Sequence, residues 1–280
     1  MRERQGESIQ NRVWEIDALR GWMIFCVLDY HLSRCVEAFY VSGLFQNVDA
    51  VAFVRYYDPL HFWFRWNETT GWSIGILSEN FIHCYLYGGV DVFFIISGIS
   101  CMFSRNNLKR ALVVFCAGGC IALFTKGLAI WTGDPSRFIR FGVLFCYAFC
   151  QFLYVFVFEK LKSKWLLLSV IPIFVIGYYL RYIGVQPTRL PIFYIFGVPQ
   201  IGDQSSDFWP VFPMLGWFLI GVVLGRKYYK EKKTLLPFPK AEKFTRPLQW
   251  LGRYSGIIYV SHIVVYTALF CGIGYLFHLL

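Results

Sequence analysis

The chain has 280 residues, of which 57% are hydrophobic, 20% aromatic and only 16% charged. Soluble domains carry about 25% charged residues, so this composition excludes intrinsic disorder and argues against a water-soluble enzyme. The net charge of +10 lies in short basic clusters between apolar runs, which is typical of topology signals and not of a nucleic-acid interface. We therefore expect a polytopic membrane protein that binds no nucleic acid.

Seven apolar stretches are long enough to cross a bilayer, which takes about 20 residues. They lie at about 18–40, 82–103, 109–130, 139–159, 165–183, 208–225 and 250–276. The predicted fold is all-α, a helical bundle embedded in membrane lipid as a single domain over residues 1–280. Residues 44–80 are too polar to span and are expected to form an extracytoplasmic or interfacial cap. Residues 190–202 are too short and suit an interfacial or re-entrant loop.

The basic residues predict the orientation of the bundle. If the chain crosses the membrane after every stretch, one set of connections carries 18 Lys and Arg residues and the opposite set carries 8. The positive-inside rule then puts the N-terminus in the cytoplasm and the C-terminus outside the plasma membrane. The largest cluster is a basic cytoplasmic loop at 226–248, which is also suited to bind anionic lipid headgroups.

Ionisable side chains inside the predicted spans indicate where function lies, because each costs about 2.5–3.5 kcal/mol at the centre of a bilayer. In the first span, Asp17, Arg20, His31 and Arg34 fall within one arc of about 100°. We expect this face to look into the protein, with Asp17 and Arg20 paired one turn apart.

Three of these groups are expected at a similar depth, on three different helices: His31, Asp91 and His262. On the last helix, His262 shares a face with Ser255, Tyr259 and Tyr266. The groups could serve only as structural hydrogen-bond partners, and for His262 that interpretation is as good as a catalytic one. For His31 we favour catalysis, because it shares its helix face with Arg20, and a buried neutral imidazole can act as a general base in transfer from a thioester. The sequence has no serine nucleophile elbow, zinc motif or phosphate-binding glycine loop, so no metal is expected.

Six short motifs resemble, in order, those of one known family. They are Glu15-Ile16-Asp17-x-Leu19-Arg20-Gly21 with His31, Phe93–Ser100, Ser104–Arg110, Phe138–Leu144, Asp207–Pro213, and Leu251–Ser255 with Tyr259 and His262. Together they span roughly residues 12–265. They resemble the transmembrane acyltransferases related to heparan-α-glucosaminide N-acetyltransferase, including the small bacterial members.

The resemblance implies transfer of an acyl group, typically acetyl from cytoplasmic acetyl-CoA, to a sugar or glycolipid on the far side of the membrane. His31 would be the catalytic base, with Asp91 or His262 orienting it. The phosphates of CoA would be held by the basic residues Arg20, Arg105, Lys109 and Arg110. The acceptor would be held by Arg140 and Asp207. The sequence leaves the oligomeric state open, a homo-oligomer included.

The chain departs from the family pattern at four positions, which hold Phe145, Met214, Tyr254 and Ile263. A member of this family that has lost its activity therefore remains an alternative. Two further alternatives are a transporter or flippase for a lipid-linked glycan and a structural membrane subunit. A transporter usually shows an internal repeat, and none is evident in this sequence.

Overall fold

The computed structural model describes residues 13–41, 88–182, 187–198, 200–202, 205 and 207–279. All regular elements within these residues are helices. The only β-type contacts among the described residues are two isolated β-bridges. The predicted all-α fold is therefore confirmed. The expected cap at 44–80 lies outside the described residues.

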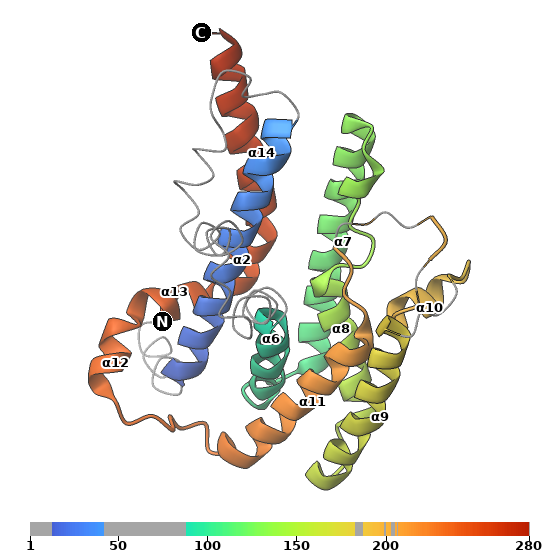
Figure 1. Ribbon diagram of the computed structural model, residues 1–280. Coiled ribbons are helices and arrows are strands. Elements are labelled where there is room, and N and C mark those ends of the chain that lie inside the picture. Colours follow the sequence, from blue (N-terminus) through green and yellow to red (C-terminus); the bar gives the residue numbers. More distant parts are fainter. Residues whose placement is uncertain are drawn as a thin grey trace, which may run out of the picture. The chain divides into compact units, whose positions relative to one another are not determined.

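The helices follow the apolar stretches of the sequence closely (Figure 1). They are α2 (Trp14–Val41), α6 (Gly88–Ile99), α7 (Asn107–Thr132), α8 (Val143–Leu153), α9 (Ser163–Tyr182), α10 (Pro191–Phe196), α11 (Val211–Tyr228), α12 (Pro239–Phe244), α13 (Arg246–Arg253) and α14 (Ser255–Leu279). Short 3-10 turns form η1 (Ser100–Met102) and η2 (Pro135–Arg137), and a π-helical turn, η3 (Tyr154–Phe158), continues α8.

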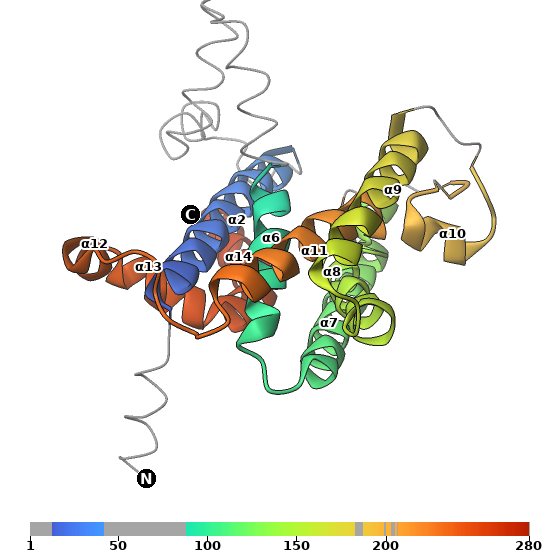
Figure 2. The same cartoon turned by 90° about the horizontal axis from the view of Figure 1, so that it is seen from below.

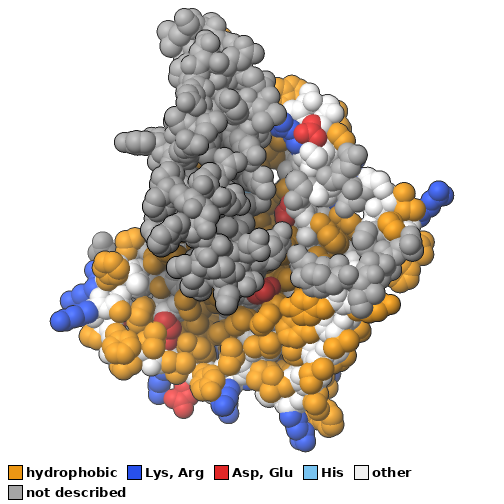
Figure 3. Space-filling view, viewed as in Figure 1, with side chains coloured by type: hydrophobic (Ala, Val, Ile, Leu, Met, Phe, Trp, Pro, Cys, Tyr) orange, Lys and Arg blue, Asp and Glu red, His pale blue; other side chains and the backbone are white. Residues whose placement is uncertain are grey.

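By length and composition, four of the described helices can cross a membrane: α7, α9, α11 and α14. Shorter apolar helices occupy Val90–Met102 and Val143–Phe158. In Figure 3, hydrophobic side chains make up much of the described surface, and Lys and Arg stand at its margins. Such a surface is suited to lipid, so the protein is an integral membrane protein.

Two expectations on chain boundaries need adjustment. The stretch predicted at 250–276 is not one helix, because α13 ends at Arg253 and α14 begins at Ser255. The segment 226–248, expected as a basic loop, contains α12 and the start of α13. Both short helices begin with a proline in their first turn, Pro239 and Pro247, where the missing N–H costs nothing.

The helices form two compact units. Among the described residues, unit 1 comprises Val13 and the residues from Asp91 to Leu236, and unit 2 comprises Trp14–Val41, residues 88–90 and the residues from Pro237 to Leu279. The prediction of a single membrane domain stays a prediction.

In unit 1, glycines bring the backbones of α6 and α11 close together. A Cβ atom added to Gly98 would lie 2.1 Å from the carbonyl oxygen of Phe218, and one added to Gly221 would lie 2.0 Å from that of Ile95. The two backbones therefore touch, as in the small-residue packing of membrane helices. Gly225, one turn beyond Gly221, continues this seam towards η1.

The C-terminal end of the α8–η3 helix is capped by a side chain of α11. Arg226 donates hydrogen bonds to the carbonyl oxygens of Glu159 at 2.7 Å and Leu161 at 2.5 Å, and to the hydroxyl of Tyr154 at 3.3 Å. A helix end leaves carbonyl groups without intrahelical partners, and one guanidinium satisfies two of them. This end of unit 1 is therefore fixed by a single cation.

Replacing Arg226 should destabilise the protein. Arg226→Gln should lower the free energy of unfolding by about 0.5–1.5 kcal/mol, because two carbonyl groups at the helix end lose charge-assisted hydrogen bonds. Arg226→Lys should recover part of the loss, since an ammonium group lacks the planar fork. Thermal unfolding in detergent measures the effect, and Lys227→Gln, an exposed neighbour, is the control that should change nothing. Equal unfolding temperatures for wild type and Arg226→Gln would contradict this role.

Unit 2 is organised by the crossing of α13 over the start of α2 (Figures 1 and 2). A Cβ added to Gly21 would lie 1.8 Å from the carbonyl oxygen of Leu248, and one added to Gly252 would lie 1.8 Å from that of Asp17. After the turn at Tyr254, α14 runs along α2. The glycines thus set where α14 begins, and with it the position of His262.

Candidate functional site

Two histidines meet on the paired helices of unit 2. The Nδ1 atom of His31 on α2 lies 2.5 Å from the Nε2 atom of His262 on α14. The rings are nearly parallel, with centroids 4.7 Å apart, and His262 is buried. His31 therefore projects from α2 towards another helix and not only towards lipid, as its position on the helix face predicted.

A backbone carbonyl sets the protonation pattern of this pair. The Nδ1 atom of His262 lies 2.5 Å from the carbonyl oxygen of Tyr259, which can only accept, so Nδ1 of His262 carries the proton. In the neutral ring Nε2 of His262 is then an acceptor, and Nδ1–H of His31 donates to it. The neutral tautomer of His31 that results keeps its lone pair on Nε2.

Aromatic rings of α14 hold His262 in place. Tyr259 and Tyr266 pack against its ring with centroid distances of 5.3 and 5.7 Å. The hydroxyl of Tyr266 also donates to the carbonyl oxygen of Leu28 on α2, at 3.2 Å. The face of α14 predicted from the sequence is thus the face that contacts α2.

An ion cluster lies at the N-terminal end of α2. Asp17 pairs with Arg20 at 3.5 Å, as predicted, and with Arg253 at the end of α13 at 3.6 Å. The carboxylate is buried, while both guanidinium groups keep partial exposure. Arg20, expected to bind CoA, is thus oriented by Asp17. The side chain of Arg34 lies outside the described residues.

The other expected donor-binding residues and Asp91 lie in unit 1. Asp91 is in the first turn of α6. Arg105 and Lys109 are exposed around the start of α7, and Arg110 lies over the ring of Tyr147 at 5.6 Å. Their functional roles stay predictions.

The two residues expected to hold the acceptor lie on neighbouring loops of unit 1. Phe141 forms a parallel bridge with Phe208, and the amide of Trp209 donates to the carbonyl oxygen of Phe141 at 3.2 Å. The exposed Arg140 donates to the side-chain oxygen of Gln200 at 3.3 Å. The loops that carry Arg140 and Asp207 are therefore joined.

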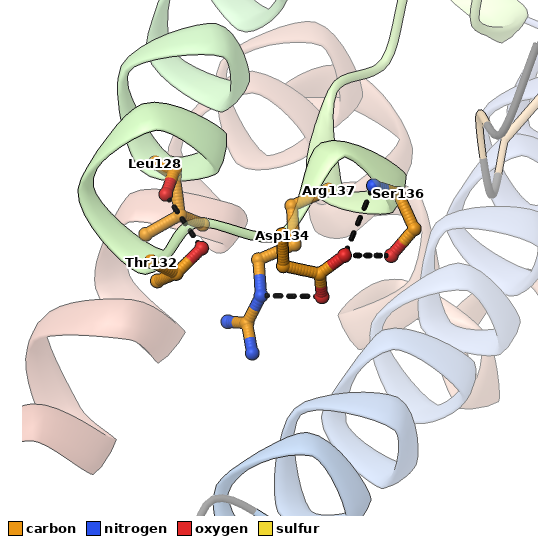
Figure 4. Close-up of polar contacts among 5 residues, drawn as sticks. All are labelled: Leu128, Thr132, Asp134, Ser136 and Arg137. Atoms are coloured by element: carbon orange, nitrogen blue, oxygen red, sulfur yellow. Dashed lines mark hydrogen bonds and ion pairs between the residues drawn. The ribbon is translucent and has the colours of Figure 1, made fainter.

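A polar turn after α7 leads into this region. Asp134 accepts hydrogen bonds from the amide and hydroxyl of Ser136 and from Arg137 (Figure 4). These bonds lower the pKa of Asp134, the Ser136 hydroxyl most strongly. Further on, the amide of Ile139 donates to the buried hydroxyl of Thr125 at 3.2 Å. The segment before Arg140 is thereby tied to α7.

Asp207 is held close to the start of α8. Its carboxylate accepts a hydrogen bond from the indole of Trp209. A Cβ added to Gly142 would lie 2.8 Å from its Oδ2 atom, so a larger residue there would push the carboxylate aside. Burial raises the pKa of Asp207 to about 6, against the opposing effect of the Trp209 hydrogen bond. A carboxyl group kept in this way at a cost in stability is typical of functional sites.

The raised pKa predicts a pH dependence of stability. Between about pH 4 and 6 the native state binds more protons than the unfolded state, so the free energy of unfolding should fall as the pH rises through this range. The fall should be about 1–3 kcal/mol and level off above pH 6. Asp207→Asn keeps an acceptor for Trp209 and should remove the slope in thermal unfolding curves. A slope that persists in the variant would assign it to another group.

Comparison with protein families gives a match to heparan-alpha-glucosaminide N-acetyltransferase, catalytic, over residues 50–264, well over half of the chain. The chain belongs to this family. Neither the curated proteins nor the solved structures give a match. The match shows a membrane acetyltransferase in general terms and confirms the resemblance inferred from the six motifs. It contains His262 and the unit 1 residues of the candidate site, while Arg20 and His31 precede it.

Among the departures from the acetyltransferase pattern, Phe145 has a clear packing role. Its ring stacks on Phe141 with a centroid distance of 6.0 Å and approaches Phe115 of α7 at 5.2 Å. Met214 is buried within α11, and Tyr254 is half exposed against Trp250. None of these three touches the histidine pair in any described contact. They alter the surroundings of the candidate residues and leave the pair intact.

Several residues that contact the candidate site residues were missed from the sequence. Gln200 and Trp209 bind the two predicted acceptor residues, and Arg253 binds Asp17. The motif Leu251–Ser255 contains Arg253, and the motif Asp207–Pro213 contains Trp209. Both residues were therefore part of the sequence motifs, but neither was assigned a role. No pattern singled out Gln200, because its bond depends on two loops meeting.

Proposed function

We propose that the protein transfers an acetyl group from cytoplasmic acetyl-CoA to an extracytoplasmic sugar or glycolipid. The observation that carries this proposal is the pair of hydrogen bonds that links the carbonyl oxygen of Tyr259 to His262 and His262 to His31. It supports a neutral His31 with its lone pair on Nε2, which is the form that a general base requires.

The proposed step conserves atoms and charge. An amino or hydroxyl group of the acceptor attacks the thioester carbonyl while Nε2 of His31 takes its proton. A new C–N or C–O bond forms as the C–S bond breaks, and the sulfur of CoA leaves as a thiolate. The imidazolium then returns the proton, directly or through water, so that CoA is released as the thiol. His262 accepts from Nδ1–H of His31 throughout and steadies the charge that forms on that ring.

The donor would be held through its phosphates. Arg20 is partly exposed, as are Arg105 and Lys109, and guanidinium and ammonium groups are suited to phosphate. Removing any one of these cations should weaken acetyl-CoA binding more than it changes the catalytic rate.

The acceptor would be held by the joined loops of unit 1. Arg140 offers a charged donor, and Asp207 a carboxyl group, beside the stacked rings of Tyr194 and Phe208, 4.2 Å apart. Sugars are commonly bound by such combinations of hydrogen-bonding groups and aromatic faces.

Thiol release by purified protein tests the proposal. With acetyl-CoA and a panel of amino and neutral glycans, free thiol should appear only with a matching acceptor, in equal amount to acetylated product. No acetyl-CoA binding, together with passage of a lipid-linked glycan across vesicles, would contradict the proposal and favour a transporter. Binding of acetyl-CoA without turnover on any acceptor would favour a relative that has lost activity.

A further inference from the structure

The helices α12 and α13 carry large aromatic side chains beside basic ones. Phe244 is 87% exposed and Phe238 is 58% exposed, and both flank the exposed lysines Lys240 and Lys243. Figure 3, drawn in the same view as Figure 1, shows hydrophobic and basic side chains next to each other where Figure 1 places α12. An aqueous connection between two spans would not need these aromatic groups.

The helix α13 has two different faces. One face, with Gln249 and Gly252, is buried, and Gly252 lies against the backbone of α2. Another face carries Trp250, which is 57% exposed, and the exposed Arg246 one turn before it. Positions 246 and 250 are four residues apart in the helix, so these two side chains point to the same side, whereas Arg253 turns to Asp17 of α2. The exposed face is therefore aromatic and cationic together.

Exposed aromatic side chains together with basic ones are typical of the headgroup region of a membrane. A topology signal requires basic residues but no aromatic ones. Trp and Tyr gather at the level of lipid headgroups, and basic helices with aromatic side chains lie in that interface. Apart from Arg253, which pairs with Asp17, residues 237–254 contain three Lys and Arg residues against one acidic residue, Glu242, so lipids with anionic headgroups are favoured.

We propose that α12 and α13 form an interfacial helix pair, Pro239–Arg253, that lies on one leaflet and binds the phosphates of anionic lipids. Phe244 and Trp250 enter the headgroup layer, while Lys240, Lys243 and Arg246 contact the lipid phosphates. The pair goes beyond the proposed acetyl transfer and does not depend on it.

Site-specific photo-crosslinking in the full chain tests this binding. The variant Phe244→p-benzoylphenylalanine is reconstituted in phosphatidylcholine vesicles with a minor share of phosphatidylglycerol, and lipid adducts are counted by mass spectrometry. Phosphatidylglycerol should be enriched roughly fivefold over its share in the vesicle. The enrichment should vanish in high salt and in the triple variant Lys240→Gln/Lys243→Gln/Arg246→Gln.

Two controls separate this result from general contact with lipid. The same probe at Phe156, an exposed position of η3, should label both lipids in their bulk ratio. The matched triple variant Lys160→Gln/Lys162→Gln/Lys164→Gln removes as much exposed charge around the start of α9 and should leave the enrichment at position 244 unchanged.

Three outcomes would overturn the inference. They are adducts at position 244 in the bulk lipid ratio, adducts to a second copy of the chain in place of lipid, and loss of the enrichment on adding acetyl-CoA. The last would identify the basic groups as a site for the donor's phosphates. Because adduct formation needs no turnover, a failure here is distinguishable from a failure of the proposed acetyl transfer.

Discussion

Replacing His31 with Asn should abolish most turnover in a folded protein. Asn offers an N–H close to the place of Nδ1, so the hydrogen bond to His262 can persist, but it has no base in place of Nε2. We expect kcat to fall by about 10²- to 10⁴-fold, the usual contribution of a general base. Thiol release measures the rate, and thermal unfolding and acetyl-CoA affinity should stay close to wild type.

The partner histidine supplies a graded control for that result. Gln can place an acceptor near the position of Nε2, so His262→Gln should retain more activity than His262→Leu, which has none. Both His262 variants should lose less activity than His31→Asn, because His262 acts on the reaction only through His31. Full activity in folded His31→Asn, or an equal loss of activity and stability in all three variants, would show that the pair is structural.

Adding one methyl group at Gly252 should be the most damaging change to the fold of unit 2. In Gly252→Ala the new Cβ would lie 1.8 Å from the carbonyl oxygen of Asp17 and 3.0 Å from the amide of Gly21. Backbone cannot move aside as a flexible side chain can, so α13 must shift away from α2. We expect a loss of about 3 kcal/mol in the free energy of unfolding, at the upper end for overpacking.

The matched control lies one turn further along. A Cβ at Gly256 meets nothing within 4 Å, and Gly256→Ala in α14 should be neutral or slightly stabilising because alanine favours helix. Thermal unfolding in detergent compares the two variants. Since the shift of α13 also moves the start of α14, Gly252→Ala should lower turnover as well. A Gly252→Ala protein as stable as Gly256→Ala would disprove the crossing.

The sequence predicts the helices well because lipid allows few alternatives for an apolar stretch of about 20 residues. The break at Tyr254 was not foreseen, since it depends on α13 packing across α2 through Gly252. Arg226 was counted only as a topology charge, although it caps η3. Both features arise from contacts between helices far apart in the chain, and the hydrophobicity pattern of the sequence does not predict such contacts.

The candidate site shows the same division. The meeting of His31 and His262 followed from depth and from the face that each occupies, which sequence spacing determines. The tautomer did not, because it depends on which ring nitrogen faces the carbonyl of Tyr259. Arg140 and Asp207 were singled out as residues, whereas the bridge from Phe141 to Phe208 that joins their loops could be found only in three dimensions.

Acetyl transfer across a sealed bilayer tests the central claim most directly. Proteoliposomes would carry an amino-sugar acceptor trapped inside, with acetyl-labelled CoA supplied outside, and the label on the trapped glycan would be measured. We predict labelled glycan in vesicles with wild-type protein facing the donor, and none with His31→Asn. Label lost to hydrolysis outside, or equal labelling by the variant, would contradict transfer assisted by His31.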